Sequence, residues 1–199
     1  MLTDGQIKTL TVFLKPRMGK KRFLHSVNVA YEARKLAKKY GVDEDKAFVA
    51  GYLHDCAKEL EPEEQRRLAE RCSLPPEAVE LAAAPVLHAV AGAVLVREEL
   101  GIEDDDIYAA IRYHTIGTPD MSPLGQIIYL ADLVSADRDY KDVKKMRKIA
   151  YEDIDEAMLE ALKFSISDSV RKGNSIAGAT MLAYNEYADK LRTANPKKK

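Results

Sequence analysis

Apolar residues recur along most of the chain at the three- and four-residue spacing of amphipathic helices. In the segment from Lys20 to Tyr40, for example, they fall at positions 23, 27, 30, 33 and 37. No segment shows the sustained two-residue alternation that is typical of a half-buried strand. The pattern therefore predicts an all-α fold, built as a helical bundle.

Turn and capping residues divide this pattern into separate helices. Gly41 is a suitable residue to end one helix, Asp43 and Ser122 can cap the next ones, and Pro62 suits a first turn. We expect helices over residues 4–14, 20–40, 44–58, 85–100, 104–113, 154–172 and 180–191, with others starting at 62, after 76 and after 122. Segment 114–119 breaks the pattern and is predicted to be a loop. The charge-rich segment 138–148 is predicted to be a solvated turn, apart from Arg138.

The chain has 199 residues, of which 46% are hydrophobic, and neither a repeat nor a linker divides it. This is enough apolar material for one buried core. We therefore expect a single domain over residues 1–199. Its core would span about 20–137, with C-terminal helices over 142–192 packed on it and a basic tail over 193–199.

Charge and cysteine content narrow the classes of function. The 31 basic and 32 acidic residues give a net charge of -1, so nothing draws the whole chain to a nucleic acid. A local basic pocket for a small phosphate ester remains possible. Two cysteines do not make a disulfide framework, and no signal peptide or 18-residue apolar stretch is present. We expect a cytoplasmic protein without membrane contact, whose oligomeric state the sequence does not predict.

Histidine and aspartate stand out as candidate chemistry. The only four histidines, at positions 25, 54, 88 and 114, each fall on a different predicted helix or helix end. Asp55, directly after His54, and Asp132 lie in apolar helices, where a carboxylate is costly unless it is paired or bound to metal. His25, His54, Asp55 and Asp132 are thus candidate metal ligands, of a type that suits iron, manganese, zinc or cobalt better than calcium. Four unrelated histidines, and a buried salt bridge at Asp132, remain the alternatives.

These residues occur in a series of linked strings. In chain order they read KRFLHSV, LHDCAK, VLHAVAGA, IRYHTIGTPDMS and IIYLAD. The series His25, His54-Asp55, Asp132 resembles the H…HD…D signature of the HD-domain phosphohydrolases. The five strings together resemble one bacterial subfamily, the symmetrical diadenosine tetraphosphate hydrolases of the YqeK type, over about residues 20–185. The resemblance implies an HD-domain enzyme that cleaves diadenosine tetraphosphate into two ADP.

The resemblance also implies roles for single residues. The metal would be iron, bound by residues His25, His54, Asp55 and Asp132, with manganese, cobalt or zinc as alternatives. His88 and His114 would lie at the phosphate end, where they either hold a second metal ion or contact the nucleotide. The substrate-binding residues would be Arg22, Lys58, His88, His114, Thr115, Arg138, Ile176 and Thr180, and the catalytic ones Asp55, Lys58, His88 and His114. The ligand would be a small nucleotide, namely ADP, GDP or a dinucleoside polyphosphate.

The residues themselves agree with some of these roles. Arg22 and Lys58 lie three and four residues from His25 and His54, so on a helix each would share a face with a candidate ligand. An arginine fork and a lysine point charge are suitable partners for a polyphosphate. Cys56, between Asp55 and Lys58, is expected to be a small buried hydrophobe rather than a nucleophile.

Two strings depart from the subfamily. Residues 135–138 read SADR where the subfamily carries a Glu-Pro-Asn-Arg-like string, and residues 177–180 read AGAT where it tends to have His-Pro-Asp-Thr. The second segment lies near the nucleotide in the subfamily, so base preference is less secure than the hydrolytic core. Two other functions stay open: an HD phosphohydrolase of another nucleotide, and a nucleotide-binding regulator with a decayed site.

Overall fold

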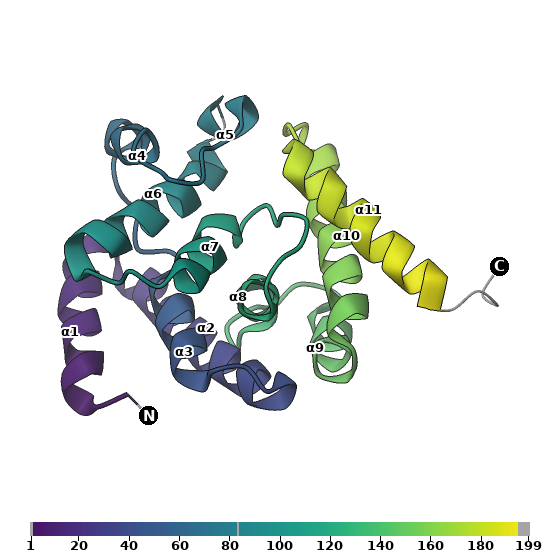
Figure 1. Ribbon diagram of the computed structural model, residues 1–199, viewed down its shortest axis with the longest axis horizontal. Coiled ribbons are helices and arrows are strands. Elements are labelled where there is room, and N and C mark those ends of the chain that lie inside the picture. Colours follow the sequence, from purple (N-terminus) through teal and green to yellow (C-terminus); the bar gives the residue numbers. More distant parts are fainter. Residues whose placement is uncertain (1, 83, 195–199) are drawn as a thin grey trace.

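The described chain is built from helices, as predicted. The computed structural model describes residues 2–82 and 84–194 and contains, within them, eleven α-helices and no strand (Figure 1). The helices are α1 (Asp4–Leu14), α2 (Lys20–Tyr40), α3 (Glu44–Leu53), α4 (Pro62–Ala69), α5 (Ala78–Ala82), α6 (Ala84–Leu100), α7 (Asp105–Tyr113), α8 (Pro123–Val134), α9 (Val143–Glu152), α10 (Ile154–Lys172) and α11 (Gly178–Ala194). No helix in this part of the chain combines the length and apolar character that crossing a membrane requires.

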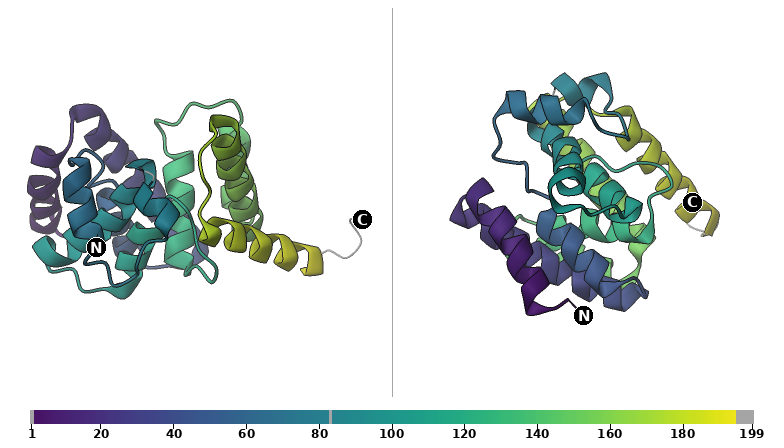
Figure 2. Two further views of the ribbon diagram at one scale, coloured as in Figure 1. Left: turned by 90° about the horizontal axis from the view of Figure 1, so that it is seen from above. Right: turned by 60° about the vertical axis from the view of Figure 1, so that its left-hand side comes forward.

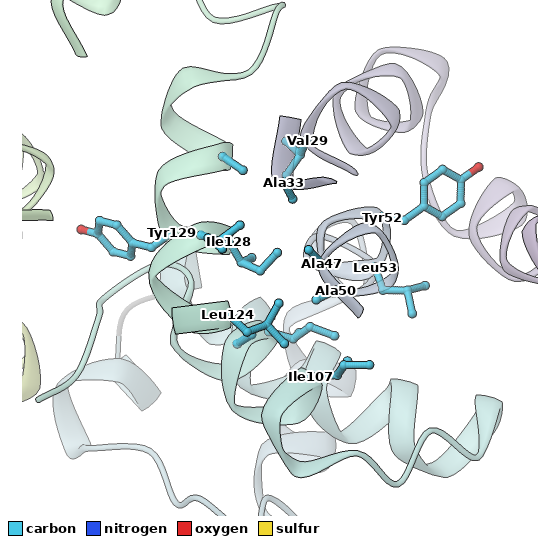
Figure 3. Close-up of a cluster of buried hydrophobic side chains, with 14 of the residues drawn as sticks. Val29, Ala33, Ala47, Ala50, Tyr52, Leu53, Ile107, Leu124, Ile128 and Tyr129 are labelled. Carbon is cyan, nitrogen blue, oxygen red and sulfur yellow. The ribbon is translucent and has the colours of Figure 1, made fainter. Parts of the chain in front are cut away.

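The core lies where α2, α3, α7 and α8 meet. Figure 3 shows Val29 and Ala33 of α2 facing α3, with Ile107 of α7 and Leu124 of α8 on the other side. The small residues on α2 and α3 let these two helices come unusually close. A Cβ placed on Gly51 would lie 3.1 Å from the Cα of Ala30, so any larger residue would crowd the backbone of α2. This close approach brings the middle of α2 beside the end of α3.

Helices α9, α10 and α11 form a second group on the α8 side of the core (Figures 1 and 2). Hydrogen bonds join α8 to each helix of this group: Tyr129 Oη donates to Ser165 Oγ at 2.9 Å, Gln126 Nε2 donates to Tyr187 Oη at 2.8 Å, and Arg147 Nε of α9 donates to Val134 O at 2.9 Å. Helix α11 starts at Gly178, two residues before the predicted start, and continues to Ala194. It therefore includes the first residues of the predicted tail, whose remainder, 195–199, lies outside the described residues.

The predicted helix over 44–58 is wrong at its C-terminal end. Helix α3 ends at Leu53, and tight turns follow, in which Cys56 N donates to Leu53 O at 2.9 Å and Lys58 N donates to Asp55 O at 3.0 Å. The His54 ring contributes to this change, because its Nδ1 hydrogen-bonds the Gly51 carbonyl at 2.7 Å. Side-chain contacts of this kind compete with the helical ladder. His54 and Asp55 therefore sit on a compact turn.

The predicted solvated turn over 138–148 is also wrong in its second half. Residues 143–152 form helix α9, which buries Val143, Met146 and Ala150 at helical spacing. Arg147 does not point into solvent but donates to the carbonyls of Val134, Ser135 and Arg138 at 2.7–2.9 Å. Those carbonyls include orphan acceptors at the end of α8. The sequence prediction was wrong because the many lysines of this segment outweigh the three apolar residues that form the buried face.

Candidate metal and nucleotide site

The four histidines converge on one place in the fold. His25 comes from α2, His54 from the end of α3, His88 from α6 and His114 from the residue after α7. The ring centroids of His25 and His54 lie 5.3 Å apart, those of His54 and His114 4.9 Å, and those of His88 and His114 5.2 Å. All four rings are buried. They form a single cluster and are not four unrelated side chains.

Asp55 lies between the four histidines and contacts two of them with each carboxylate oxygen, so that it belongs to two triads. Its Oδ2 lies 3.6 Å from His54 Nε2 and 4.0 Å from His25 Nε2, whereas its Oδ1 lies 3.1 Å from His88 Nε2 and 3.7 Å from His114 Nε2. Within each triad, the possible ligand atoms lie within 4.8 Å of one another. We call His25, His54 and Asp55 the first triad, and Asp55, His88 and His114 the second triad.

Asp132 of α8 joins the first triad. Its Oδ1 lies 2.9 Å from His25 Nε2 and 3.8 Å from His54 Nε2. The first triad and Asp132 thus bring together two imidazole nitrogens and two carboxylates, one group from each of α2, the end of α3, the turn that follows it, and α8. All four groups predicted as metal ligands are therefore in one place, as a mixed nitrogen and oxygen set.

Hydrogen bonds on the far side of the rings orient the histidines toward this centre. Nδ1 of His54 donates to Gly51 O and Nδ1 of His114 to Ile111 O, both at 2.7 Å, and Nδ1 of His25 donates to Asp137 Oδ2 at 2.8 Å. In a neutral ring these bonds leave the Nε2 lone pair free, as in most metal-binding histidines. His54 Nε2 is buried and has no hydrogen-bond partner among the described residues. A divalent cation in the first triad would satisfy it.

His88 is held differently, because Lys58 stands beside it. Lys58 Nζ lies 3.1 Å from His88 Nδ1 and 3.3 Å from its Nε2, and it also donates to Pro85 O at 3.0 Å. Because the Asp55 carboxylate is an acceptor and lies 3.1 Å from Nε2, the neutral ring carries its proton on Nε2 and leaves Nδ1 to accept from the ammonium group. The Nε2–H points between Asp55 Oδ1 and His114 Nε2, at 3.1 and 3.3 Å. The second triad therefore has an N–H donor and a neighbouring ammonium group, whereas His54 in the first triad has a free lone pair.

Burial sets the charges of these groups. It lowers the pKa of His54 to about 4 and that of His88 to about 3, so both rings are neutral near pH 7. Burial alone would raise the pKa of Asp55, but His54 and the hydrogen bonds from His114 and His88 hold it well below its usual range. Burial likewise lowers the pKa of Lys58. The site thus combines ionised carboxylates with neutral rings at His54 and His88. For His25, burial also lowers the pKa, but the hydrogen bond and charge of Asp132 and the hydrogen bond to Asp137 raise it overall. A bound cation would favour the neutral form of that ring, which is the form that metal ligation requires.

Two arginines flank the first triad on its open side. Arg22 Nη1 lies 2.7 Å from Asp55 Oδ2, and the guanidinium of Arg138 pairs with Asp132 Oδ1 and donates to Asp132 O at 2.7 Å. Each arginine engages a carboxylate oxygen that faces the cluster. Both side chains are partly exposed, about 31% for Arg22 and 37% for Arg138, so they can also reach a ligand that arrives from solvent.

A cavity of about 480 Å³ lies between α5, α6 and α10–α11, and Thr115, the residue after His114 of the second triad, lines it. It contains three predicted substrate-binding residues, namely Thr115, Ile176 and Thr180. Pro85, whose carbonyl holds Lys58, lies on its wall. Thr115 Oγ1 is buried and lacks a hydrogen-bond partner in the described part of the chain. The cavity is of the size and mixed polarity of small-ligand sites.

Asp137 is a member of the site that no sequence pattern indicated. Besides accepting from His25, its carboxylate accepts from Ser135 Oγ at 2.9 Å and Asn28 Nδ2 at 3.1 Å. Asp137 belongs to the string that departs from the subfamily, immediately before Arg138. Its position beside a candidate ligand follows from the turn after α8, which no local pattern predicted.

Cys56 is a buried hydrophobe, as predicted. It is fully buried and its Sγ points to Gly92 O at 3.7 Å, away from the histidines. Burial raises the pKa of this thiol, so it stays protonated. Both cysteines are free thiols in the structure.

Comparison with known proteins agrees with this geometry. The HD domain family matches residues 22–137, which contain both triads and Asp132. This chain belongs to the HD-domain family. It is 39% identical to the symmetrical bis(5'-nucleosyl)-tetraphosphatase of Halalkalibacterium halodurans over 87% of this chain and 92% of that protein. It is 35% identical to the enzyme of the same name from Bacillus subtilis, over 86% of this chain and 92% of that protein.

A solved structure shares the whole fold of this HD-domain protein. The crystal structure of a predicted HD superfamily hydrolase involved in NAD metabolism from Clostridium acetobutylicum superposes with a TM-score of 0.88 at 34% sequence identity. The match covers 96% of this chain and 99% of that one. The predicted family and its all-α fold are thereby confirmed, including the helices that follow the matched HD domain.

Proposed function

We propose that this protein is a metal-dependent phosphohydrolase that cleaves diadenosine tetraphosphate symmetrically into two ADP. Relatives with 35–39% identity over most of the chain carry this activity in their names. The observation that carries the proposal is the position of Asp55, which belongs to both triads. The first triad suits a metal ion, and the second triad lies near the cavity and contains an N–H donor. That arrangement holds a cation and a phosphate chain next to each other.

The proposed metal ligands are His25, His54, Asp55 and Asp132, and iron is the proposed metal, with manganese, cobalt or zinc as alternatives that the same ligands accept. When bound, the metal would lower the pKa of water and polarise a phosphoryl oxygen. The protein contributes the geometry: Gly51 O and Asp137 fix the ring orientations of His54 and His25. Asp55, with its pKa held low, acts as a shared ligand and hydrogen-bond acceptor rather than as a proton acceptor.

The second triad is proposed to hold the phosphate chain. Lys58 supplies a positive charge and His88 Nε2 supplies a hydrogen-bond donor, both aimed at the space beside Asp55. His114 lies beside His88, and the next residue, Thr115, lines the cavity. Hydrolysis adds water to one of the two central phosphorus atoms and breaks its bond to the central bridging oxygen. The leaving ADP needs charge neutralisation more than protonation, and Lys58 provides it.

Arg22 and Arg138 are proposed to exchange partners when the site is loaded. Each pairs with a carboxylate oxygen that a metal ion would use, on Asp55 and on Asp132. Ligation would weaken these ion pairs and leave two partly exposed guanidinium groups free for phosphate oxygens. Guanidinium groups bind phosphate in a bidentate manner, which would fix the orientation of the substrate.

The nucleoside is proposed to occupy the 480 Å³ cavity. Ile176 supplies apolar surface, and Thr180 and Thr115 supply hydroxyl groups along its walls. The unpartnered, buried hydroxyl of Thr115 favours a polar ligand at the inner end of the cavity. A small nucleotide such as ADP, GDP or a dinucleoside polyphosphate is thus the proposed ligand class.

One experiment tests this function. The protein is purified without added metal, its iron, manganese, cobalt and zinc contents are measured, and diadenosine tetraphosphate is assayed with each metal by product analysis. Two ADP per substrate supports the proposal, whereas ATP with AMP, or free phosphate alone, rejects symmetrical cleavage. Tight binding of ADP or GDP without turnover with any metal would instead identify a nucleotide-binding regulator.

A further inference from the structure

One carboxylate joins two segments of the chain that both contribute residues to the wall of the cavity, and we call these two segments its rims. Glu77 lies just before α5, on one rim, and its Oε2 and Oε1 accept hydrogen bonds from Gly178 N and Ala179 N, both at 2.7 Å. These two amides open α11, on the other rim, 101 and 102 residues away in the chain. Figure 1 shows α5 and the first turn of α11 facing each other at the top of the molecule.

Helix α11 needs this carboxylate because it has no cap of its own. The residue before Gly178 is Ala177, whose side chain offers no acceptor to the first amides of the helix. A negative charge at a helix N-terminus is favoured by the helix dipole as well as by the hydrogen bonds. A Cβ on Gly178 would lie 3.2 Å from Glu77 Oε2, so glycine leaves room for this contact. The acceptor for the first amides of α11, which segment 177–180 does not provide, is thus supplied by Glu77 from the opposite rim.

Glu77 is itself anchored to the phosphate end of the site. Its backbone N donates to Glu80 Oε2 at 2.8 Å, and the Glu80 carboxylate pairs with both terminal nitrogens of Arg112 at 2.8 and 2.9 Å. Glu80 and Arg112 are each only 1% exposed, and Arg112 lies two residues before His114. The contacts therefore run from α11 through Glu77 and Glu80 to the end of α7.

We propose that Glu77 is a positioning residue that clasps the first turn of α11 to the segment before α5 and so closes the outer wall of the nucleoside cavity. Val79, Glu80 and Ala82 line the cavity on one side of this clasp, and Ala177 and Thr180 line it on the other. A nucleoside that contacts both walls binds best when the clasp has set their spacing. The proposal rests on the proposed function, because it assumes that the nucleotide occupies this cavity.

The test compares the metal-loaded wild-type protein with Glu77→Ala and Glu77→Gln. The backbone amides of residues 178–182 are followed by hydrogen exchange, the affinity for ADP by calorimetry, and diadenosine tetraphosphate cleavage by steady-state kinetics. Loss of a charge-assisted hydrogen-bond pair predicts about tenfold faster exchange at these amides and about tenfold weaker ADP binding in Glu77→Ala. KM should rise by a similar factor with kcat and metal content unchanged. Glu77→Gln keeps one acceptor and should lie between the two.

The matched control is Glu63→Ala, which removes an exposed glutamate on α4 that pairs only with Arg66 among the described residues. It should leave exchange, ADP affinity and KM unchanged. Unaltered exchange at 178–182 in Glu77→Ala, or faster exchange with unaltered ADP affinity, overturns the proposal. Tighter ADP binding also overturns it, since the carboxylate would then occupy the place of the ligand. A wild-type protein that neither binds ADP nor cleaves the substrate refutes the proposed function instead, and the exchange measurement still decides whether the clasp exists.

Discussion

The two triads share Asp55 and the same residue types, yet their environments make them chemically different. In the first triad, the Gly51 carbonyl accepts from Nδ1 of His54, so the Nε2 lone pair of that ring faces the centre, while His25 lies between the carboxylates of Asp137 and Asp132. In the second, Asp55 accepts from Nε2 of His88, and Lys58 lies 3.1 Å from its Nδ1. The groups around each ring thus decide whether it offers a lone pair or a proton.

The comparison shows how one cluster can hold two kinds of ligand. The ligand atoms of both triads are spaced closely enough for a metal ion. The first triad, with Asp132, carries two carboxylates, which would suit a cation, whereas Lys58 beside the second adds an ammonium group, which would offset the charge of an anion. The short distances at Asp55 couple the two sites directly. A phosphate chain on the second triad would therefore lie beside a metal on the first without any further element.

Replacement of the shared residue should have the largest effect. Asp55→Ala removes a carboxylate from both triads, so we expect turnover to fall by at least about a thousandfold and metal content to drop. Metal analysis and product assays on the purified variant measure both quantities. Asp189→Ala, on the exposed end of α11, serves as the control and should change neither. Full activity in Asp55→Ala would refute the assignment of the site.

Removal of Lys58 should affect the second triad while leaving metal binding by the first triad intact. Lys58→Ala takes away the charge proposed to neutralise the phosphate chain, so turnover should fall by about a hundredfold while metal in the first triad is retained. Because Nδ1 of His88 then loses its donor, the ring can release Nε2, and the variant should take up more metal than the wild type at high metal concentration. Lys35→Ala, an exposed change on α2, is the control. Loss of the tightly bound metal in Lys58→Ala would show that the two triads are not separable in this way.

A smaller effect is expected from the contact behind the first triad. Asp137→Asn keeps the shape of the side chain but removes the charge that accepts from His25 Nδ1. Outer-sphere partners of metal-binding histidines typically contribute about 10- to 100-fold to affinity, and we expect the lower part of that range because Asp137 is partly exposed. Competition with a chelator measures the metal affinity, and excess metal should restore turnover. Asp139→Asn, two residues further on, should have no effect on either.

The fold was predictable wherever caps and periodicity coincided. Helix 20–40 ends as predicted, and the helices that start at 44 and 62 begin as predicted, because Gly41, Asp43 and Pro62 are strong local signals of helix ends or starts. The helices over 4–14 and 154–172 also have their predicted bounds. The two errors arise from side chains that bind backbone carbonyls. The His54 ring binds the Gly51 carbonyl three residues earlier, near the end of α3, and Arg147 binds carbonyls 9–13 residues earlier, at the end of α8 and in the turn that follows.

The site divides in the same way. The histidines and aspartates could be proposed from the sequence because a buried charge needs a partner, and the structure brings them together. The roles of Asp137 and Glu77 could not be proposed, since each acts on a residue about a hundred positions away. Nothing in their immediate neighbours distinguishes them from solvated acids. The contacts behind the ligands, rather than the ligands themselves, were beyond the reach of the sequence.

The smallest effect is expected at the residue next to the shared carboxylate. Cys56 directly follows Asp55, but its Sγ points away from both triads toward Gly92. Cys56→Ala should therefore leave turnover within about twofold of the wild type. It should lower the free energy of unfolding by about 1 kcal/mol, the cost of a small buried cavity. Kinetics and thermal denaturation measure the two changes, and a folded variant with turnover reduced by orders of magnitude would give the thiol a chemical role. Comparison of its turnover with that of Asp55→Ala then tests whether a residue affects catalysis because its side chain points into the site or merely because it is adjacent in the sequence.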